Sequence, residues 1–263
     1  MKKILLVAFS LTLLSLSCQL ALPGGLAPSA APAATSTSKP TRVPTATATP
    51  APTNTPLPTP NKTATAGALA TATASARLAQ IDAELQTYGF STKEGHLGWI
   101  HEPVTLKVAG HWEGKPAVDY PDLQVTDFVI HSDITWESSS GLAACGFLLR
   151  SEPDLIKGKQ YQFFIMRQAF NPLWDIEYYQ NGDFQGSVLW LTDAPALEYA
   201  AGSTNQVTVV VQKNLITGYA NGAKLGRGVD NRLKQGVTAF LAWQESGETT
   251  CGFTNAWLWV LKD

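Results

Sequence analysis

Hydrophobic and polar residues alternate in short runs from Val104 to the end of the chain, and Gly, Asn, Pro and Asp separate the runs. In one run, Val207, Val209 and Val211 share one parity. Alternation with a period of two is typical of strands that bury one face. The pattern predicts ten strands: Val104–Ala109, Gln124–Trp136, Ala143–Arg150, Gln160–Gln168, Trp174–Tyr179, Ser187–Leu191, Gln206–Gln212, Leu215–Ala220, Val237–Gln244 and Thr250–Leu261.

So many strands with so little helix predict an all-β fold, an antiparallel two-sheet sandwich or a barrel, over residues 90–263. Asn221-Gly222 predicts a tight turn between two of its strands. The run Trp257–Val260 is apolar at every position, so we expect the last strand to be central and covered on both faces.

One segment before these strands follows a helical period. Leu78, Ile81, Leu85 and Tyr88 recur at spacings of three, four and three residues, which places them on one face of a helix. We predict a helix within residues 64–89, and Gly89 is a natural stop. The apolar stripe either packs against the strands or mediates self-association.

The first residues have the pattern of an export signal over 1–18. Two lysines precede an apolar run of thirteen residues, Ile4–Leu16, which is short for a membrane-spanning helix. Ser15-Leu16-Ser17-Cys18 resembles a bacterial lipobox, although that pattern prefers Leu where Ser15 stands. The resemblance implies lipidation of Cys18 and anchoring on the extracellular face of the cell envelope. Cleavage as an ordinary signal peptide would instead release the protein.

Residues 19–63 are rich in Pro, Thr, Ala and Ser. Such a composition buries too little apolar surface to offset the entropy of ordering, so we predict a disordered linker with extended polyproline character. A linker of this kind would act as a spacer between an anchor and the strand-rich body.

Charge divides the chain at the same place as the pattern. All 21 Asp and Glu lie at or after Asp82, together with 13 of the 19 Lys and Arg, which makes the net charge of this part −8. All eight Trp and all seven Tyr are there as well. An acidic body argues against nonspecific nucleic-acid binding, which needs a basic face.

Three cysteines are an odd number for an exported protein. If Cys18 carries lipid, Cys145 and Cys251 remain in an oxidising compartment, where we expect them to form a disulfide. The alternative is two buried free thiols that act as small apolar side chains.

The order of several short motifs resembles concanavalin A-like sandwiches, in particular the laminin-G-like and 3-keto-disaccharide-hydrolase-type branches. The resemblance extends from about Leu123 to Leu261 and implies a jelly roll with one concave sheet, on which members bind or cleave glycans. The motifs are Asp127-Phe128-Val129-Ile130, Cys145-Gly146-Phe147-Leu148-Leu149-Arg150, Tyr161-Gln162-Phe163-Phe164-Ile165, Asn205-Gln206-Val207-Thr208-Val209, Ile216-Thr217-Gly218-Tyr219-Ala220-Asn221-Gly222, Gly236-Val237-Thr238-Ala239-Phe240 and Phe253-Thr254-Asn255.

Asp175 and Glu177 are the best candidates for catalytic acids. Residues i and i+2 of a strand face the same way, so this pair shares one side. Retaining glucanases of this superfamily carry Glu-x-Asp-x-Glu, and Leu173 stands where the first Glu would be. The resemblance therefore implies that the nucleophile is absent, and a solvated strand face is the alternative interpretation. We predict no metal and no cofactor.

Aromatic and cationic side chains favour ligand binding over catalysis. Trp rings stack on the C–H faces of sugars, and arginines donate to hydroxyls. We predict a non-catalytic module that binds a glycan or another cell-surface ligand. The alternatives are a glycan-active hydrolase and a structural or adhesion module; the sequence does not predict the oligomeric state. The predicted ligand contacts are Arg150, which opposes the Cys145 face by parity, and Arg167, Trp174, Trp190 and Trp243.

Overall fold

The computed structural model describes residues 62–138, 142–168 and 171–262. Contacts divide the chain into two units, Met1–Pro58 and Thr59–Asp263, and every described residue belongs to the second. The predicted signal, Cys18 and all but the last residues of the predicted linker lie outside the described residues. Within the described ranges, no helix is long and apolar enough to cross a bilayer.

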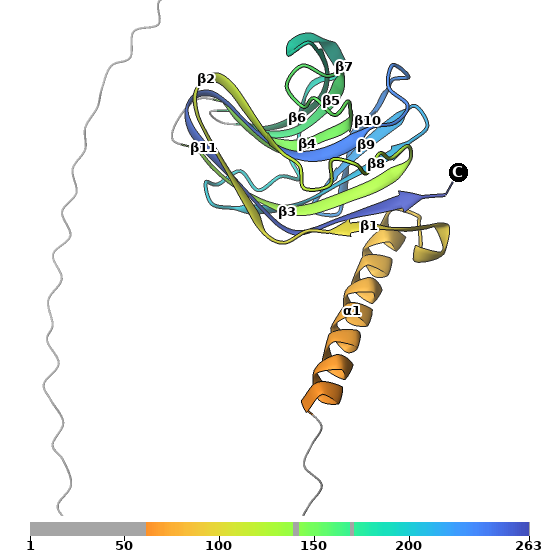
Figure 1. Ribbon diagram of the computed structural model, residues 1–263. Helices are drawn as coiled ribbons and strands as arrows, with labels where there is room; N and C mark the ends of the chain where they lie inside the picture. Colours follow the sequence, from red (N-terminus) through yellow and green to blue (C-terminus); the bar gives the residue numbers. More distant parts are fainter. Residues whose placement is uncertain (1–61, 139–141, 169–170, 263) are drawn as a thin grey trace, which may run out of the picture. The chain divides into compact units, whose positions relative to one another are not determined.

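The described residues form one α-helix, a short 3-10 helix and eleven strands (Figure 1). The predicted all-β class with one preceding helix is confirmed. Along the chain the elements are α1 (Lys62–Thr87), η1 (Thr92–Glu94), β1 (Gly95–Ile100), β2 (Val104–Ala117), β3 (Phe128–Ser138), β4 (Ala143–Ser151), β5 (Gln160–Gln168), β6 (Asn171–Gln180), β7 (Asp183–Asp193), β8 (Thr204–Gln212), β9 (Leu215–Ala220), β10 (Ala223–Val229) and β11 (Val237–Leu261).

The strands form two packed layers joined by β2 and β11. The hydrogen-bonded order is β10-β9-β8-β3-β11-β4-β5-β6-β7, all antiparallel, and β1 and β2 pair with β11. The first part of β11 pairs with β4 and its later part with β3, so β11 belongs to both layers. In Figure 1 the β4–β7 layer curves over the layer that holds β3, β8, β9 and β10.

The sequence pattern predicted two separate final strands, and the structure corrects this to one long strand. β11 continues through Ser246 and Gly247 because β2 pairs with it without interruption, with Gly247 opposite Gly110. Both glycines have positive φ, 87° and 132°, a backbone conformation that other residues rarely adopt. These glycines allow the β2–β11 ribbon to bend from one layer to the other.

The core lies between the layers and follows the predicted alternation. Asn221-Gly222 forms the predicted tight turn between β9 and β10, with φ of 49° and 78°. Across the core, a Cβ at Gly226 of β10 would lie 2.7 Å from the Trp174 ring of β6. The absence of a side chain there allows the two layers to approach at this end.

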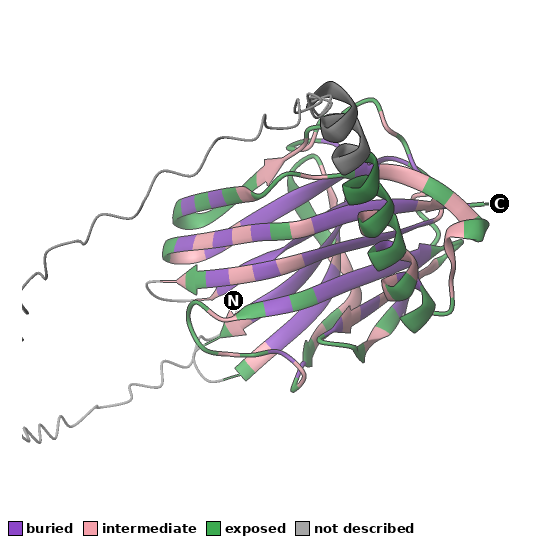
Figure 2. Ribbon diagram, turned by 90° about the horizontal axis from the view of Figure 1, so that it is seen from below, coloured by how far each residue is buried: buried purple, intermediate pink, exposed green. Residues whose placement is uncertain are grey.

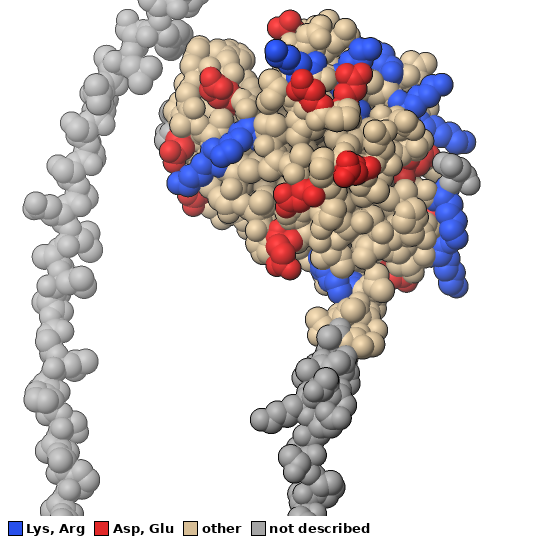
Figure 3. Space-filling view, viewed as in Figure 1, with Lys and Arg blue, Asp and Glu red and all other residues tan. Residues whose placement is uncertain are grey.

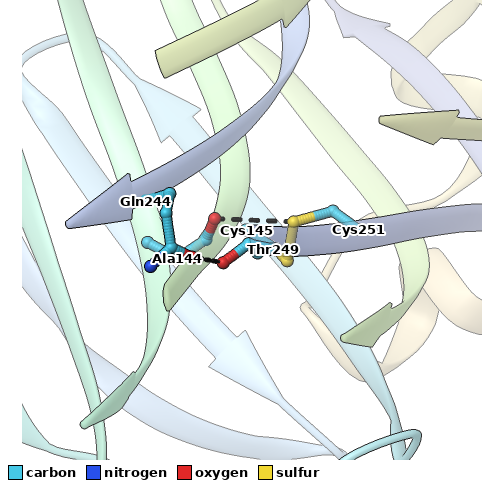
Figure 4. The surroundings of a disulfide bond; sticks show 5 residues. All are labelled: Ala144, Cys145, Gln244, Thr249 and Cys251. Carbon is cyan, nitrogen blue, oxygen red and sulfur yellow. Dashed lines mark hydrogen bonds between the residues drawn. A yellow bond between two sulfur atoms is a disulfide. The ribbon is translucent and has the colours of Figure 1, made fainter. Parts of the chain in front are cut away.

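The predicted disulfide is confirmed. Cys145 of β4 and Cys251 of β11 are fully buried, and their Cα atoms are 5.8 Å apart (Figure 4). The bond joins the two layers across the core, because β4 belongs to one and this part of β11 to the other.

The helix packs its apolar stripe on the outer face of the β3–β11 layer. Ile81 and Leu85 are buried against a cluster that includes Trp257 and Trp259, and Trp257 donates a 2.7 Å hydrogen bond to Glu84. Figure 2 shows the buried strand segments that lie beneath the helix. The last strand is thus central and covered on both faces, as predicted, whereas Leu78 at the start of the stripe remains 41% exposed.

Candidate functional site

A groove of about 760 Å³ lies on the outer face of the layer formed by β4–β7 and the adjoining parts of β2 and β11. Alternation decides which side chains reach it: on β6, for example, Trp174 and Ile176 enter the core, whereas Asp175 and Glu177 face the groove. In the space-filling view, the molecule is hollowed at its upper edge, between the end of the β2–β11 ribbon and β7 (Figure 3). This volume is typical of ligand sites.

The floor of the groove is mostly apolar. It belongs to a hydrophobic cluster on the opposite face of this layer from the main core, separate from the cluster beneath the helix, and β4, β5, β6 and β11 supply the buried side chains of this cluster. The side chains on the other face of these strands belong to the main core, so this layer is apolar on both faces beneath the groove. The floor residues are Ala144, Leu148, Phe164, Met166 and Leu241.

Aromatic side chains form the two walls. At the β2–β11 end, Trp112 and Trp243 are in edge contact, with ring centroids 5.4 Å apart. At the β7 end are Phe184 and Trp190. Trp112 is 61% exposed and Trp190 is 71% exposed, so both present large apolar faces to solvent.

A polar stripe crosses the floor on β5 and β6. The register sets Gln162 opposite Glu177, and Gln160 opposite Tyr179. The Tyr179 hydroxyl donates a 2.9 Å hydrogen bond to Glu177. Next to them, Asp175 is only 4% exposed, and its Oδ1 atom has no hydrogen-bond partner among the residues that the structure describes. An acceptor buried without a partner is free to bind a ligand group.

The two carboxyl groups are electrostatically coupled. Burial, and secondarily the charge of Glu177, raises the pKa of Asp175 to about 9. Burial also raises the pKa of Glu177, partly opposed by the hydrogen bond from Tyr179. The pKa of Tyr179 is raised by burial and then by the charge of Glu177. Burial therefore favours the protonated, neutral form of both carboxyl groups, and most strongly that of Asp175.

We predict that Asp175→Asn flattens the pH dependence of stability. In the folded protein Asp175 keeps its proton up to about pH 9, whereas in the unfolded chain its pKa is 3.8 and it loses the proton at lower pH. The stabilisation of the folded state by this proton is therefore complete below pH 3.8 and is lost as the pH rises to about 9. Relative to the wild type, the variant should gain about 1 kcal/mol in free energy of unfolding per pH unit between pH 5 and 8. Urea denaturation at several pH values measures this. The exposed Asp183→Asn serves as the control and should show no such gain, and parallel profiles for Asp175→Asn and the wild type would contradict the prediction.

The groove brings together four of the residues singled out in the sequence. Trp190 and Trp243 line its walls, and Asp175 and Glu177 its floor. The two acids lie side by side on β6, not on opposite sides of the groove. Leu173 is buried in the same floor cluster, at the position where the resemblance would place a nucleophile.

Three other predicted contacts do not line the groove. Trp174 is fully buried in the main core, because it shares the parity of Ile176. Arg150 is 1% exposed: its φ of 49° and a register shift of β4 against β11 interrupt the alternation, so the parity argument fails there. Arg167, at the end of β5, lies over the Tyr199 ring at 5.0 Å. The predicted placement of these residues on the concave face is therefore wrong.

The sequence interpretation missed Trp112, Tyr179 and Phe184. Trp112 belongs to the second half of β2, which was not predicted as a strand. A signal was available in Trp112 itself, a large aromatic residue between His111 and Glu113 in a polar segment. No group of three or more His, Cys, Asp or Glu in the described part of the chain is arranged to hold a metal ion.

No family model matches the sequence, and no curated protein matches it. Solved structures similar to this chain include a carbohydrate-binding module, CBM66, from Bacillus subtilis, with 15% identity and a TM-score of 0.44, covering 61% of this chain and 96% of that one. Sheep galectin-11 in complex with glycerol has 9% identity and a TM-score of 0.39, covering 57% and 99%. A β-1,3-1,4-glucanase derived from a mouse hindgut metagenome has 11% identity and a TM-score of 0.42, covering 54% and 69%.

The strand order, the two layers and the curved sheet are those of a jelly-roll sandwich. The predicted antiparallel two-sheet sandwich is therefore confirmed.

Proposed function

We propose that this protein binds a carbohydrate chain in the groove without cleaving it. The observation that carries the proposal is the pair of exposed tryptophans, Trp112 and Trp190, on the two walls of an open groove. Large apolar side chains exposed around a concavity are typical of a binding site. A structural or adhesion module would be favoured by a flat or filled face on this layer. The open groove argues against that alternative.

The chemistry of the lining fits sugar rings. Indole faces pack against the apolar C–H faces of a pyranose. Hydroxyl groups need donors and acceptors, and the stripe of Gln160, Gln162, Glu177 and Tyr179 supplies both. The remaining floor is apolar and continuous, so a chain lying along it would bury apolar surface as well.

Display outside the cell forms part of the same proposal. The signal-like leader and the Pro- and Thr-rich segment support export. Lipidation of Cys18 would anchor the protein to the envelope, with the linker as a spacer. Mass spectrometry of the membrane fraction tests this, and Cys18→Ser should release the protein into the medium.

We predict that Trp190→Ala lowers the affinity for a bound oligosaccharide at least about tenfold, or about 1.4 kcal/mol. Because the ring is 71% exposed, its loss should change the free energy of unfolding by less than about 1 kcal/mol. A glycan-array screen of the purified protein identifies the oligosaccharide, and calorimetry then measures the affinity.

Two variants control this experiment. Trp190→Phe keeps an aromatic face and should retain part of the affinity. Tyr120→Ala removes an aromatic residue that is 40% exposed outside the groove, against Trp99, and should leave binding unchanged. An equal loss of affinity for the oligosaccharide in Tyr120→Ala and Trp190→Ala would show that the groove is not the binding site.

Hydrolysis is the second candidate function, because two acids with raised pKa values lie on the groove floor. Glycosidases need their two carboxyl groups on opposite sides of the scissile bond, about 5.5 Å or more apart. Asp175 and Glu177 share one face of β6, and Leu173 stands at the next position of that face, where the retaining glucanases carry a Glu. Release of reducing ends from a bound glycan, abolished by Glu177→Gln, would establish hydrolysis and overturn the non-catalytic proposal.

A further inference from the structure

We infer that the groove selects a glycan whose sugars carry free amino groups, bound as ammonium at the Asp175–Glu177 pair. This inference rests on the proposed function, since it names the class of carbohydrate for the same groove. The inference follows from two features of the groove: the charges of the side chains that line it, and the buried Oδ1 atom of Asp175, which lacks a hydrogen-bond partner among the described residues.

The first observation is the one-sided charge of the lining. Three carboxylic acids line the groove, Glu113 from β2 and Asp175 and Glu177 from β6. Among the described residues that line it there is no Lys, Arg or His. Uronic acids, sulfated sugars and phosphorylated sugars would therefore meet acidic groups with no cation to pair with.

The second observation is the Oδ1 atom of Asp175. It is buried on the groove floor and lacks a hydrogen-bond partner among the described residues. The facing strand contributes Gln160 and Gln162 to the groove, which are uncharged, and Tyr179 already donates to Glu177. An ammonium group has three donors and a positive charge, so it satisfies this acceptor and the charge of Glu177 together.

The charge balance of the site favours the same ligand. Without a ligand, burial and secondarily the charge of Glu177 favour the protonated form of Asp175. An arriving ammonium group places a positive charge beside both carboxyl groups, which favours their ionised forms, and a proton that Asp175 then loses passes to solvent. A neutral hydroxyl group can accept or donate one hydrogen bond there but does not compensate the charge.

The test compares three hexasaccharides by calorimetry on the purified full chain: β-1,4-linked glucosamine, its N-acetylated counterpart and an oligogalacturonate. We expect the amine-bearing hexamer to bind at least tenfold more tightly than the N-acetylated one, and the acidic hexamer not to bind. Added salt should reduce the preference for the amine, because the attraction is partly Coulombic.

The matched variant is the double amide Asp175→Asn/Glu177→Gln, which keeps the shape and the hydrogen bond from Tyr179. It should bind both neutral and amine-bearing hexamers with similar affinity. Trp190→Ala should also lower the affinity for the amine-bearing hexamer. An unchanged affinity in this variant would indicate nonspecific attraction to an acidic protein and overturn the inference.

The remaining outcomes separate the two proposals. Equal or tighter binding of the N-acetylated hexamer by the wild type, or a preference for the amine that persists in the double amide, would overturn this inference and leave carbohydrate binding intact. If no glycan on an array bound to the protein, the proposed function itself would fail.

Discussion

Replacing Arg150 by Met will lower the free energy of unfolding by about 3–5 kcal/mol. The guanidinium group is fully buried and donates four hydrogen bonds: to the carbonyl oxygens of Thr126, Lys213 and Leu233, at 2.7–2.9 Å, and to the carboxylate of Asp127 at 3.1 Å. Burial lowers the pKa of Arg150, and the charge of Asp127 opposes this shift.

The size of the effect follows from what the substitution leaves behind. Met fills much of the same volume but donates no hydrogen bond, so three carbonyl groups and one carboxylate lose a donor at partly buried sites. These groups belong to the segment before β3, the β8–β9 turn and the segment before β11. Arg150 thus holds together three connections that are far apart in the sequence.

Chemical denaturation with guanidinium chloride measures this loss. Arg167→Met is the control, because Arg167 is partly exposed and its guanidinium group lies over the ring of Tyr199. This substitution should lower the free energy of unfolding by about 1 kcal/mol or less. Arg150→Lys should fall between them, since one ammonium group does not reach every acceptor. A loss below about 1 kcal/mol for Arg150→Met would contradict the assignment of this residue as a structural anchor.

Removing the disulfide should have an effect of similar size. Cys145 and Cys251 are separated by 106 positions, and closing a loop of that length restricts the unfolded chain by about 4–5 kcal/mol in the chain-entropy model. We therefore expect the double variant Cys145→Ala/Cys251→Ala to lose about 3–5 kcal/mol in free energy of unfolding. The bond also joins the two layers covalently across the core.

Denaturation curves with and without a reducing agent complete this experiment. The reducing agent should destabilise the wild type by a comparable amount and leave the double variant unaffected. If reduction changed neither protein, the two cysteines would be acting as buried apolar side chains, which is the alternative that the sequence left open.

The sequence pattern predicted strands well where each strand buries one face. The alternation of Val207, Val209 and Val211 predicted the bounds of β8 to within two residues, because those side chains enter the core and their neighbours do not. It failed for β1 and β10 and for the second half of β2, which lies mostly exposed. In these segments, backbone hydrogen bonds to β9 or β11 maintain the strand. Such pairing produces little hydrophobic pattern in the sequence.

The candidate site was predictable only in part, for a related reason. Parity correctly indicates that Asp175 and Glu177 share a face, but it does not say whether that face is the core, the solvent or a groove. Trp174 and Trp190 are equally large and apolar in the sequence, yet one is in the core and the other is exposed on a wall. Arg150 was misplaced because a bulge interrupts the alternation on which its assignment depended.

The sequence by itself determined the all-β class, the helix with its stripe and the acidic, aromatic character of the body, because these follow from local period and composition. It favoured a bond between Cys145 and Cys251, but only the tertiary structure brings their Cα atoms within 5.8 Å. Only the tertiary structure decided where the sheet curves and which tryptophans remain in solvent. It alone places on the floor of a groove a carboxyl oxygen, Oδ1 of Asp175, that has no hydrogen-bond partner among the described residues. Those properties depend on contacts between strands that are distant in the chain, and no local pattern records them.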